Sequence, residues 1–233
     1  KEERTILMKT QLKWLALALP VTLAAAEPVY HVAMDGSLDA FGADKAKIKT
    51  VQTKNAADFV PGVFKQALNV VPEKPAPCLM KLPGFNYVQA TVAFWFRPAW
   101  KEGESAWIIN SRDTDWKPVR FYLLHTKEGN FDLSVCIPGQ VQIFGKDSLK
   151  PGEWAHIAFT WDLRKSEIQF FLNGKPVRTR TVKDAFNPET KPIRPAVFFG
   201  REGETGSGNG AYDDFKMFDR VLNAEEIAEL AKK

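Results

Sequence analysis

Carboxylate pairs are the first candidates for chemistry, because glycoside cleavage usually needs two carboxyl groups that flank the scissile bond. Asp213 and Asp214 are adjacent, so a regular strand would point them to opposite faces. The other close pairs, Glu102 with Glu104 and Glu202 with Glu204, lie in glycine-containing stretches typical of loops. Three histidines and no Gly-x-Ser-x-Gly give no sign of a nucleophilic triad. These patterns predict that the protein is not an enzyme.

Two tryptophans lie where a core position is not obvious. Trp100 follows a proline and precedes a glycine, and Trp116 lies in a charged stretch between two expected strands. A sugar ring has an apolar face and a rim of hydroxyl groups, which suit an exposed aromatic ring beside planar polar groups. The predicted ligand-binding residues are Trp100, Arg112, Asp115, Trp116, Arg120 and Tyr122. The alternative is that either tryptophan ring folds back over the edge of the domain.

Short runs rich in β-branched and aromatic residues must position these side chains. Glycine, proline, asparagine or aspartate clusters separate the runs, as expected for strands and turns. The expected strands are 87–96, 106–111, 119–125, 131–137, 141–144, 154–161, 168–172 and 196–199. Asn173 and Gly174 tolerate the positive φ angles of a tight hairpin turn. The pattern predicts an all-β fold of two antiparallel sheets packed face to face.

One helix is expected, at the C-terminus. Asn223 can cap its first turn and Glu226 stands three residues later, which is the spacing of a capping box. Ile227, Leu230 and Ala231 share one face of this helix. We expect that face to pack against the sandwich.

The N-terminal stretch resembles a secretory signal peptide. A short basic region at 8–13 precedes an apolar run at 14–23 and three alanines at 24–26, so we expect residues 1–26 to be removed, with Met8 as the true start and residues 1–7 as a mis-started stretch. Residues 27–233 then form one domain that is secreted or periplasmic. Cys78 and Cys136 are either a structural disulfide or two buried thiols.

Composition narrows the classes of partner. The 233 residues are 45% hydrophobic and 12% aromatic, which is enough to build a sizeable core. The formal net charge of +4 is small and partly belongs to the expected signal peptide, so no nucleic-acid partner is predicted. No later stretch is apolar enough for a transmembrane helix. Oligomeric state is left open.

Five segments in sequential order resemble the laminin-G-like jelly roll of the concanavalin A-like lectin and glucanase superfamily, as found in secreted proteins of bacterial type. They are an opening strand with an Asp-Gly turn, the segment leading into the next strand, a Trp-bearing strand, a central strand with its hairpin, and a final strand with a closing helix. Their positions are 31–37, 62–68, 91–98, 152–158 with 169–174, and 210–222 with 225–227.

The resemblance implies an antiparallel jelly-roll sandwich and a set of candidate functions. Members often bind a structural calcium ion where the first and last strands meet, and by position the candidates here are Asp35, Asp39 and Asp213. The related glucanases carry acidic residues at i, i+2 and i+4 of one strand, a spacing that no expected strand here has. We therefore expect a secreted, non-catalytic module that binds a glycan or another extracellular surface ligand. A polysaccharide-cleaving hydrolase or lyase, and a protein-binding adhesion module, are the alternatives.

Overall fold

The computed structural model describes residues 26–42, 47–48, 57–74, 78–79, 88–112, 121–135, 142–146, 149–181, 196–200 and 208–233. Its elements are β1 Tyr30–Val32, β2 Ala40–Gly42, β3 Lys47–Ile48, β4 Asp58–Pro61, β5 Gln66–Val70, β6 Cys78–Leu79, β7 Gln89–Pro98, β8 Ala106–Arg112, β9 Phe121–His125, β10 Asn130–Val135, β11 Gln142–Lys146, β12 Ala155–Asp162, β13 Glu167–Leu172, β14 Lys175–Thr181, β15 Ala196–Phe198, β16 Gly210–Phe218 and α1 Ala224–Leu230. The expected all-β fold is confirmed.

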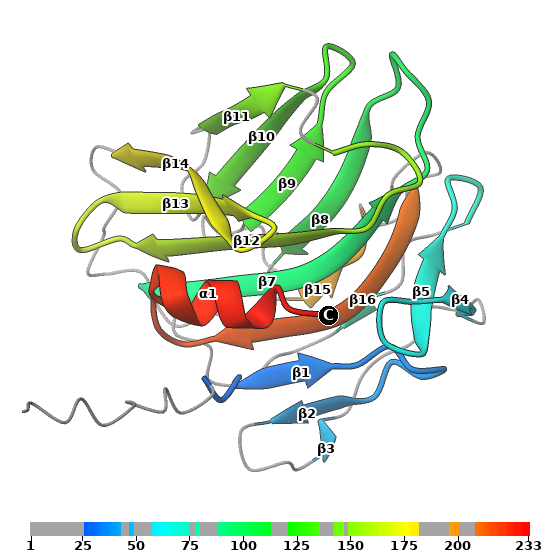
Figure 1. Cartoon of the computed structure of the whole chain (residues 1–233), viewed down its shortest axis with the longest axis horizontal. Coiled ribbons are helices and arrows are strands. Elements are labelled where there is room, and N and C mark those ends of the chain that lie inside the picture. The colour runs from blue at the N-terminus through cyan, green and yellow to red at the C-terminus, as the bar shows by residue number, and fades with distance from the viewer. Residues whose placement is uncertain are drawn as a thin grey trace, which may run out of the picture.

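Two sheets form the sandwich (Figure 1). Sheet A has the strand order β14-β13-β12-β7-β16-β1-β2-β3, and β5 adds to β16 with β4 beside it. Sheet B has the order β11-β10-β9-β8-β15-β6. Every strand pairing in the described chain is antiparallel.

Alternation along the strands places the core between the sheets. In β7, Phe94 and Phe96 are fully buried and belong to the main core, whereas Ala93 belongs to a second cluster beneath α1. Tyr212 of β16 crosses the sandwich, because its hydroxyl donates a hydrogen bond to the Ile108 carbonyl oxygen in sheet B at 2.6 Å. The two sheets are therefore joined by a polar contact as well as by apolar packing.

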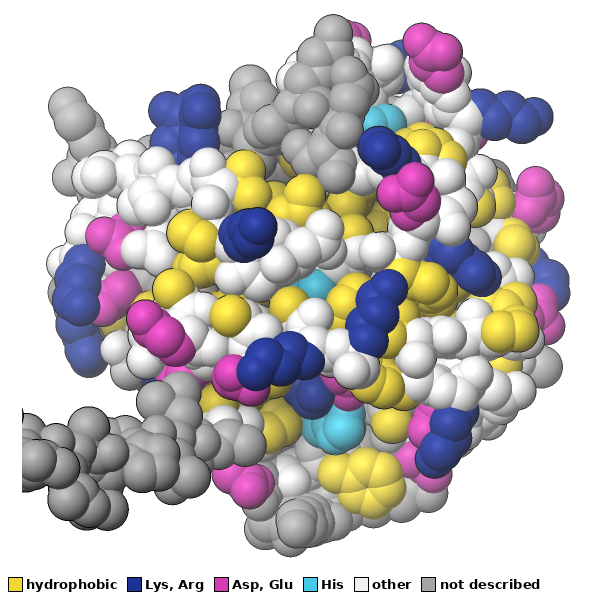
Figure 2. All heavy atoms as spheres, in the orientation of Figure 1, with side chains coloured by type: hydrophobic (Ala, Val, Ile, Leu, Met, Phe, Trp, Pro, Cys, Tyr) yellow, Lys and Arg dark blue, Asp and Glu magenta, His cyan; other side chains and the backbone are white. Residues whose placement is uncertain are grey.

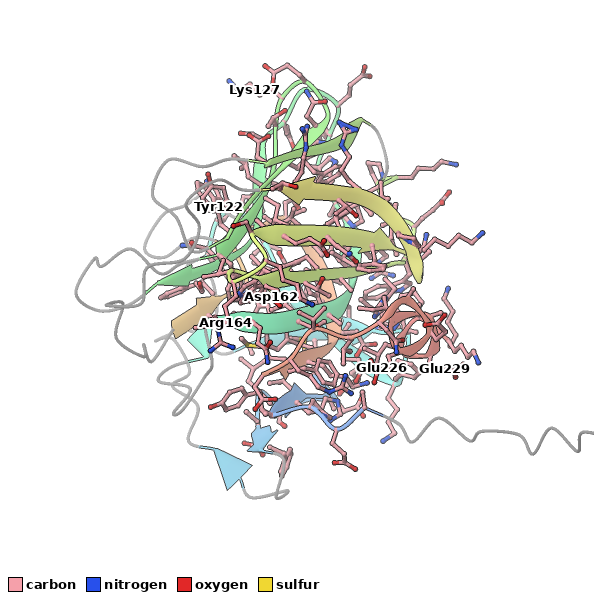
Figure 3. The ribbon with its side chains drawn as sticks, turned by 90° about the vertical axis from the view of Figure 1, so that its left-hand side faces the viewer. Tyr122, Lys127, Asp162, Arg164, Glu226 and Glu229 are labelled. Carbon is pink, nitrogen blue, oxygen red and sulfur yellow. The ribbon has the colours of Figure 1, made fainter. Side chains whose placement is uncertain are left out.

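Helix α1 covers the outer face of sheet A. The Glu226 amide donates to Asn223 Oδ1, and Glu226 Oε2 accepts from the Asn223 amide, so the predicted capping box is present. Ile227 packs with Ala158 and Phe171, which point away from the main core. Figure 3 shows α1 and sheet B on opposite sides of sheet A. Charged side chains lie among hydrophobic ones on the face that carries α1 (Figure 2).

The hairpin after β13 is also confirmed. Asn173 and Gly174 have φ angles of 51° and 76°, the left-handed values that the turn requires. The following strand, β14, was not among the expected strands because it reads Lys-Pro-Val-Arg-Thr-Arg-Thr and lacks apolar alternation. It lies at one edge of sheet A, and all of its residues except Arg180 are exposed.

A bulge in β16 overturns the expectation that adjacent aspartates face opposite ways. Asp214 has a φ of 51°, and the register with β7 shifts between Asp213 and Lys216. Asp214 Oδ1 lies 2.7 Å from His31 Nε2, while its Oδ2 accepts from Lys216 Nζ at 2.6 Å. Asp214 is thereby tied to the outer face of sheet A, where Asp213 also lies, because Asp213 is the cross-strand partner of Trp95.

Two predictions concern segments that the structure does not describe. The expected signal peptide lies outside the described residues except for Ala26, and so does Cys136. Cys78 is placed in β6 by its backbone alone. Among the residues that are described, no helix is long and apolar enough to span a membrane.

Candidate functional site

Trp100 is a core residue, so the expectation of an exposed ring there is wrong. Its side chain is only 4% exposed and belongs to the main core. The ring stacks on His125 with centroids 4.2 Å apart and an interplanar angle of 11°, and Phe96 packs at 5.6 Å. The alternative, in which the ring folds back onto the sandwich, describes this position.

The other predicted ligand-binding residues belong to β8, to β9 and to the sequence segment between these strands. Asp115, Trp116 and Arg120 lie outside the described residues. Arg112 is the last residue of β8, and only its backbone is described. Tyr122 lies in β9 between Phe121 and Leu123, which both belong to the core, so its side chain faces away from sheet A. It is labelled on the side of the sandwich away from α1 (Figure 3).

The outer face of sheet B therefore forms the candidate binding face, which we define by Trp107, Asn110, Tyr122, Leu124 and Asp132. These residues share the outward orientation because their neighbours along the strands are core residues. Asn110 lies opposite Tyr122, and Leu124 lies between Trp107 and Asp132 on the neighbouring strands. The rings of Trp107 and Tyr122 are 5.0 Å apart at an interplanar angle of 60°. Three adjacent strands thus bring aromatic and polar side chains to one face of sheet B, where Asn110 and Tyr122 are buried.

Trp107, Asn110 and Asp132 were not among the predicted site residues. Strand alternation alone would have pointed Trp107 and Asp132 outward. It would have turned Asn110 inward, because strict alternation from Trp107 puts every second residue on the same face. A register shift between Trp107 and Ile109 moves Asn110 to the outside, and both Ile108 and Ile109 are then buried in the core.

Two oxygen atoms on the candidate binding face are buried without a hydrogen-bond partner. They are Asn110 Oδ1 and Asp132 Oδ1. Burial raises the pKa of the Asp132 carboxyl above its usual range, and the negative charge of Glu128 raises it further. An unpaired buried acceptor costs free energy that a hydrogen-bond donor would recover. The face therefore holds an aromatic pair and two buried acceptors without partners; Asn110 and Tyr122 are themselves buried, and Trp107, Leu124 and Asp132 are the more accessible side chains.

The acidic residues proposed for calcium are brought together only in part. The buried Asp213 accepts hydrogen bonds at Oδ2 from the amides of Val63 and Phe64, at 2.7 and 2.9 Å. Gly62 is required beside them, because a Cβ there would come within 2.5 Å of Asp213 Oδ2. Asp35 meets the same loop, accepting from the Gln66 amide at 3.2 Å. One loop thus connects the early Asp-Gly turn with the last strand.

These residues meet only part of what calcium needs, which is six to eight oxygen ligands. Asp213 Oδ1 is buried without a partner, and burial raises the pKa of this carboxyl although the two amides oppose the change. Asp35 Oδ2, however, already lies 3.2 Å from Lys65 Nζ. Asp39 does not join the pair, since no group of three or more acidic, histidine or cysteine residues that could hold a metal occurs in the described chain.

Comparison with known proteins identifies the family. The profile described as the concanavalin A-like lectin/glucanases superfamily, of laminin-G type, matches residues 80–228. The chain belongs to this superfamily, as its jelly-roll architecture also indicates. It is 27% identical to bovine (Bos taurus) serum amyloid P-component over 127 residues, which is 51% of this chain and 52% of that protein. It therefore spans about half the length of this relative.

Solved structures with the same fold are more distant in sequence. The binding domain of Paraclostridial Mosquitocidal Protein 1 aligns with a TM-score of 0.67 and 16% identity, over 88% of this chain and 52% of that one. The binding domain of botulinum neurotoxin serotype D aligns with a TM-score of 0.66 and 13% identity, over 88% and 50%. Domain 4 of a GH43 extracellular arabinanase from Geobacillus stearothermophilus, in complex with arabinotriose, aligns with a TM-score of 0.62 and 15% identity, over 90% of this chain and all of that domain.

Proposed function

We propose that the protein is a non-catalytic binding module that recognises a glycan on the outer face of sheet B, acting outside the cytoplasm. The observation that carries the proposal is the Trp107–Tyr122 aromatic pair beside Asn110 and Asp132, whose buried oxygen atoms have no partner. A domain of the same fold is known in complex with arabinotriose, which makes sugars the first ligand class to test. An extracellular protein ligand is the alternative.

The acidic residues favour binding over catalysis. Asp132 is the one acidic residue in the described strands of sheet B. Glycoside cleavage usually needs two carboxyl groups beside the bond. Asp213 and Asp214 lie in sheet A. Asp213 accepts hydrogen bonds from two backbone amides, and the Asp214 carboxylate contacts the side chains of His31 and Lys216. Both therefore already have structural partners.

Replacing Trp107 tests the binding face. We expect Trp107→Ala to weaken glycan binding by about tenfold, because aromatic contacts contribute about 0.5–1.5 kcal/mol beyond area burial and about 1.4 kcal/mol corresponds to tenfold in affinity. Isothermal titration calorimetry with arabinotriose and with cello-, xylo- and manno-oligosaccharides measures the effect. Trp154→Ala is the matched control. Trp154 is partly exposed, it immediately precedes β12 of sheet A, and its ring contacts Arg97 of β7 rather than any residue of the candidate binding face.

Three outcomes of that titration are informative. Loss of binding in Trp107→Ala with retention in Trp154→Ala supports the proposed face. Equal affinity of the wild type and Trp107→Ala for a bound sugar means that the sugar binds elsewhere. Release of reducing sugar during the titration would replace the binding module with an enzyme.

We also propose that a calcium ion completes the partial acidic site at Asp35 and Asp213, as a structural rather than a ligand-binding ion. The support is the buried Asp213 oxygen that has no partner.

In the presence of a chelator, we expect Asp213→Asn to leave the melting temperature nearly unchanged or slightly raised, because burial already favours the neutral form of this side chain. With millimolar calcium, the wild type should gain a rise in melting temperature that the variant lacks. Equal curves with and without calcium in the wild type would remove the ion from the proposal.

A further inference from the structure

The two unpartnered oxygen atoms of the candidate binding face lie on opposite sides of β9. Asn110 is opposite Tyr122 on one side, and Asp132 is opposite Leu124 on the other side. Two strand spacings across the sheet and two residues along it separate these positions by about 12 Å. That distance exceeds one sugar ring, so a ligand that reaches both residues has at least two rings.

Both oxygen atoms are acceptors, and this determines which chemical groups can pair with them. Asn110 Oδ1 accepts hydrogen bonds only, and the Asp132 carboxyl, when it is ionised, also has no proton to donate. A ligand must therefore bring a donor to Asp132, and a donor also suits Asn110 Oδ1, although the Asn110 amide can turn its Nδ2 group toward an acceptor. Sugar hydroxyls do so, whereas a ligand carboxylate or sulfate would place acceptor against acceptor.

The negative charges near Asp132 also disfavour a ligand that carries a carboxylate or sulfate. Asp132 takes part in none of the ion pairs of the described chain. Glu128, in the turn before β10, adds a second negative charge close enough to act on Asp132. A like charge brought against an uncompensated carboxylate is disfavoured, and interfaces use such repulsion to reject wrong partners.

We infer that the candidate binding face selects neutral, hydroxyl-rich glycans of at least two sugar rings, and that Asp132 is the residue that rejects their carboxylated counterparts. The inference rests on the proposed function, since it names the ligand class of the same face. It adds a role for Asp132 in specificity that is separable from affinity, because the aromatic pair contributes to binding whatever charge the sugar carries.

Pairs of polymers that share a backbone but differ in charge test this inference. The probes are hydroxyethyl cellulose against carboxymethyl cellulose, and methyl-esterified against de-esterified homogalacturonan, measured by biolayer interferometry on the full chain. We expect the wild type to prefer the neutral member by about tenfold or more at low salt. The preference should shrink as salt is raised, because surface charges are screened.

Two variants assign the preference to a residue. Asp132→Asn should bring the affinities for the two members of a pair to within about threefold, mainly by strengthening binding of the carboxylated one. Glu153→Gln removes one exposed carboxylate outside sheet B and should leave the wild-type preference unchanged. Unchanged melting temperatures show that the variants remain folded.

The outcomes separate this inference from the proposed function. Equal or tighter binding of the carboxylated polymers by the wild type, still lost in Trp107→Ala, overturns the charge selectivity and leaves the glycan face in place. A neutral preference that persists in Asp132→Asn overturns the role of Asp132. Binding to no member of either pair overturns both the selectivity and the proposed glycan face for these backbones.

Discussion

Tyr212→Ala is expected to lower the free energy of unfolding by about 3–5 kcal/mol, the range for removing a large aromatic side chain from a packed core. The Tyr212 side chain is fully buried. Its ring centroid lies 4.7 Å from that of Phe96 and 5.3 Å from that of Phe199. Its hydroxyl donates a hydrogen bond to the Ile108 carbonyl oxygen in sheet B. The substitution therefore opens a cavity and breaks the polar contact between the sheets. Chemical denaturation followed by tryptophan fluorescence measures the loss.

Tyr212→Phe separates the hydroxyl from the ring. Burial raises the pKa of the Tyr212 phenol, so the group stays a neutral donor to the Ile108 carbonyl oxygen. Phenylalanine keeps the ring but leaves that carbonyl without its donor, at a cost of about 1–3 kcal/mol. If both variants lost the same stability, the hydrogen bond rather than the ring would be the main contribution. If neither lost stability, the described packing would be wrong.

The second large effect is a loss of stability in mild acid caused by His156. Its side chain is 2% exposed and packs edge-on against Trp95, with ring centroids 5.3 Å apart. The pKa of His156 is lowered from 6.5 to about 4, chiefly by burial and also by the positive charge of Lys216, while the negative charge of Asp214 opposes the change. The folded protein therefore keeps this histidine neutral at a pH where the unfolded chain would protonate it.

The sign of the pH effect follows from proton uptake. Between pH 6.5 and about 4 the unfolded state binds a proton at His156 that the folded state does not, so stability falls as pH falls through this window. Below about pH 4 both states are protonated and the contribution is constant. The shift corresponds to about 3 kcal/mol of unfolding free energy.

His156→Phe is the variant that isolates this contribution. It keeps an aromatic ring against Trp95 and removes the titrating group, whose Nδ1 is buried without a partner. The difference in unfolding free energy between wild type and variant should change by about 3 kcal/mol between pH 6.5 and 4, since other groups titrate equally in both proteins. A His156 pKa near 6.5 by NMR, or parallel pH profiles of the two proteins, would refute the assignment.

The sequence was informative wherever a local rule and the tertiary packing agree. Apolar alternation located β7, β12 and β13, and the Asn223–Glu226 spacing located α1 with its cap. It failed where packing between distant segments decides. Nothing near Trp100 indicates that His125 will stack on it, and the bulges that redirect Asn110 and Asp214 depend on the register with neighbouring strands. The candidate binding face could therefore be predicted in part, through Tyr122, but not as the set of residues that forms it.

Strand β14 also affects whether two copies of the protein can pair along the edge of sheet A. Lys175 and Arg178 are exposed cations on this edge strand of sheet A, and Arg180 is a partly buried one. The strand has no acidic residue, and Pro176 removes one backbone donor. A second copy that paired its β14 with this edge would set like charges against one another and lose a ladder bond. Such edges are how soluble β proteins avoid strand-to-strand aggregation. Replacing these cations with threonine or valine would remove the charge repulsion and leave Pro176 as the remaining obstacle to pairing along this edge.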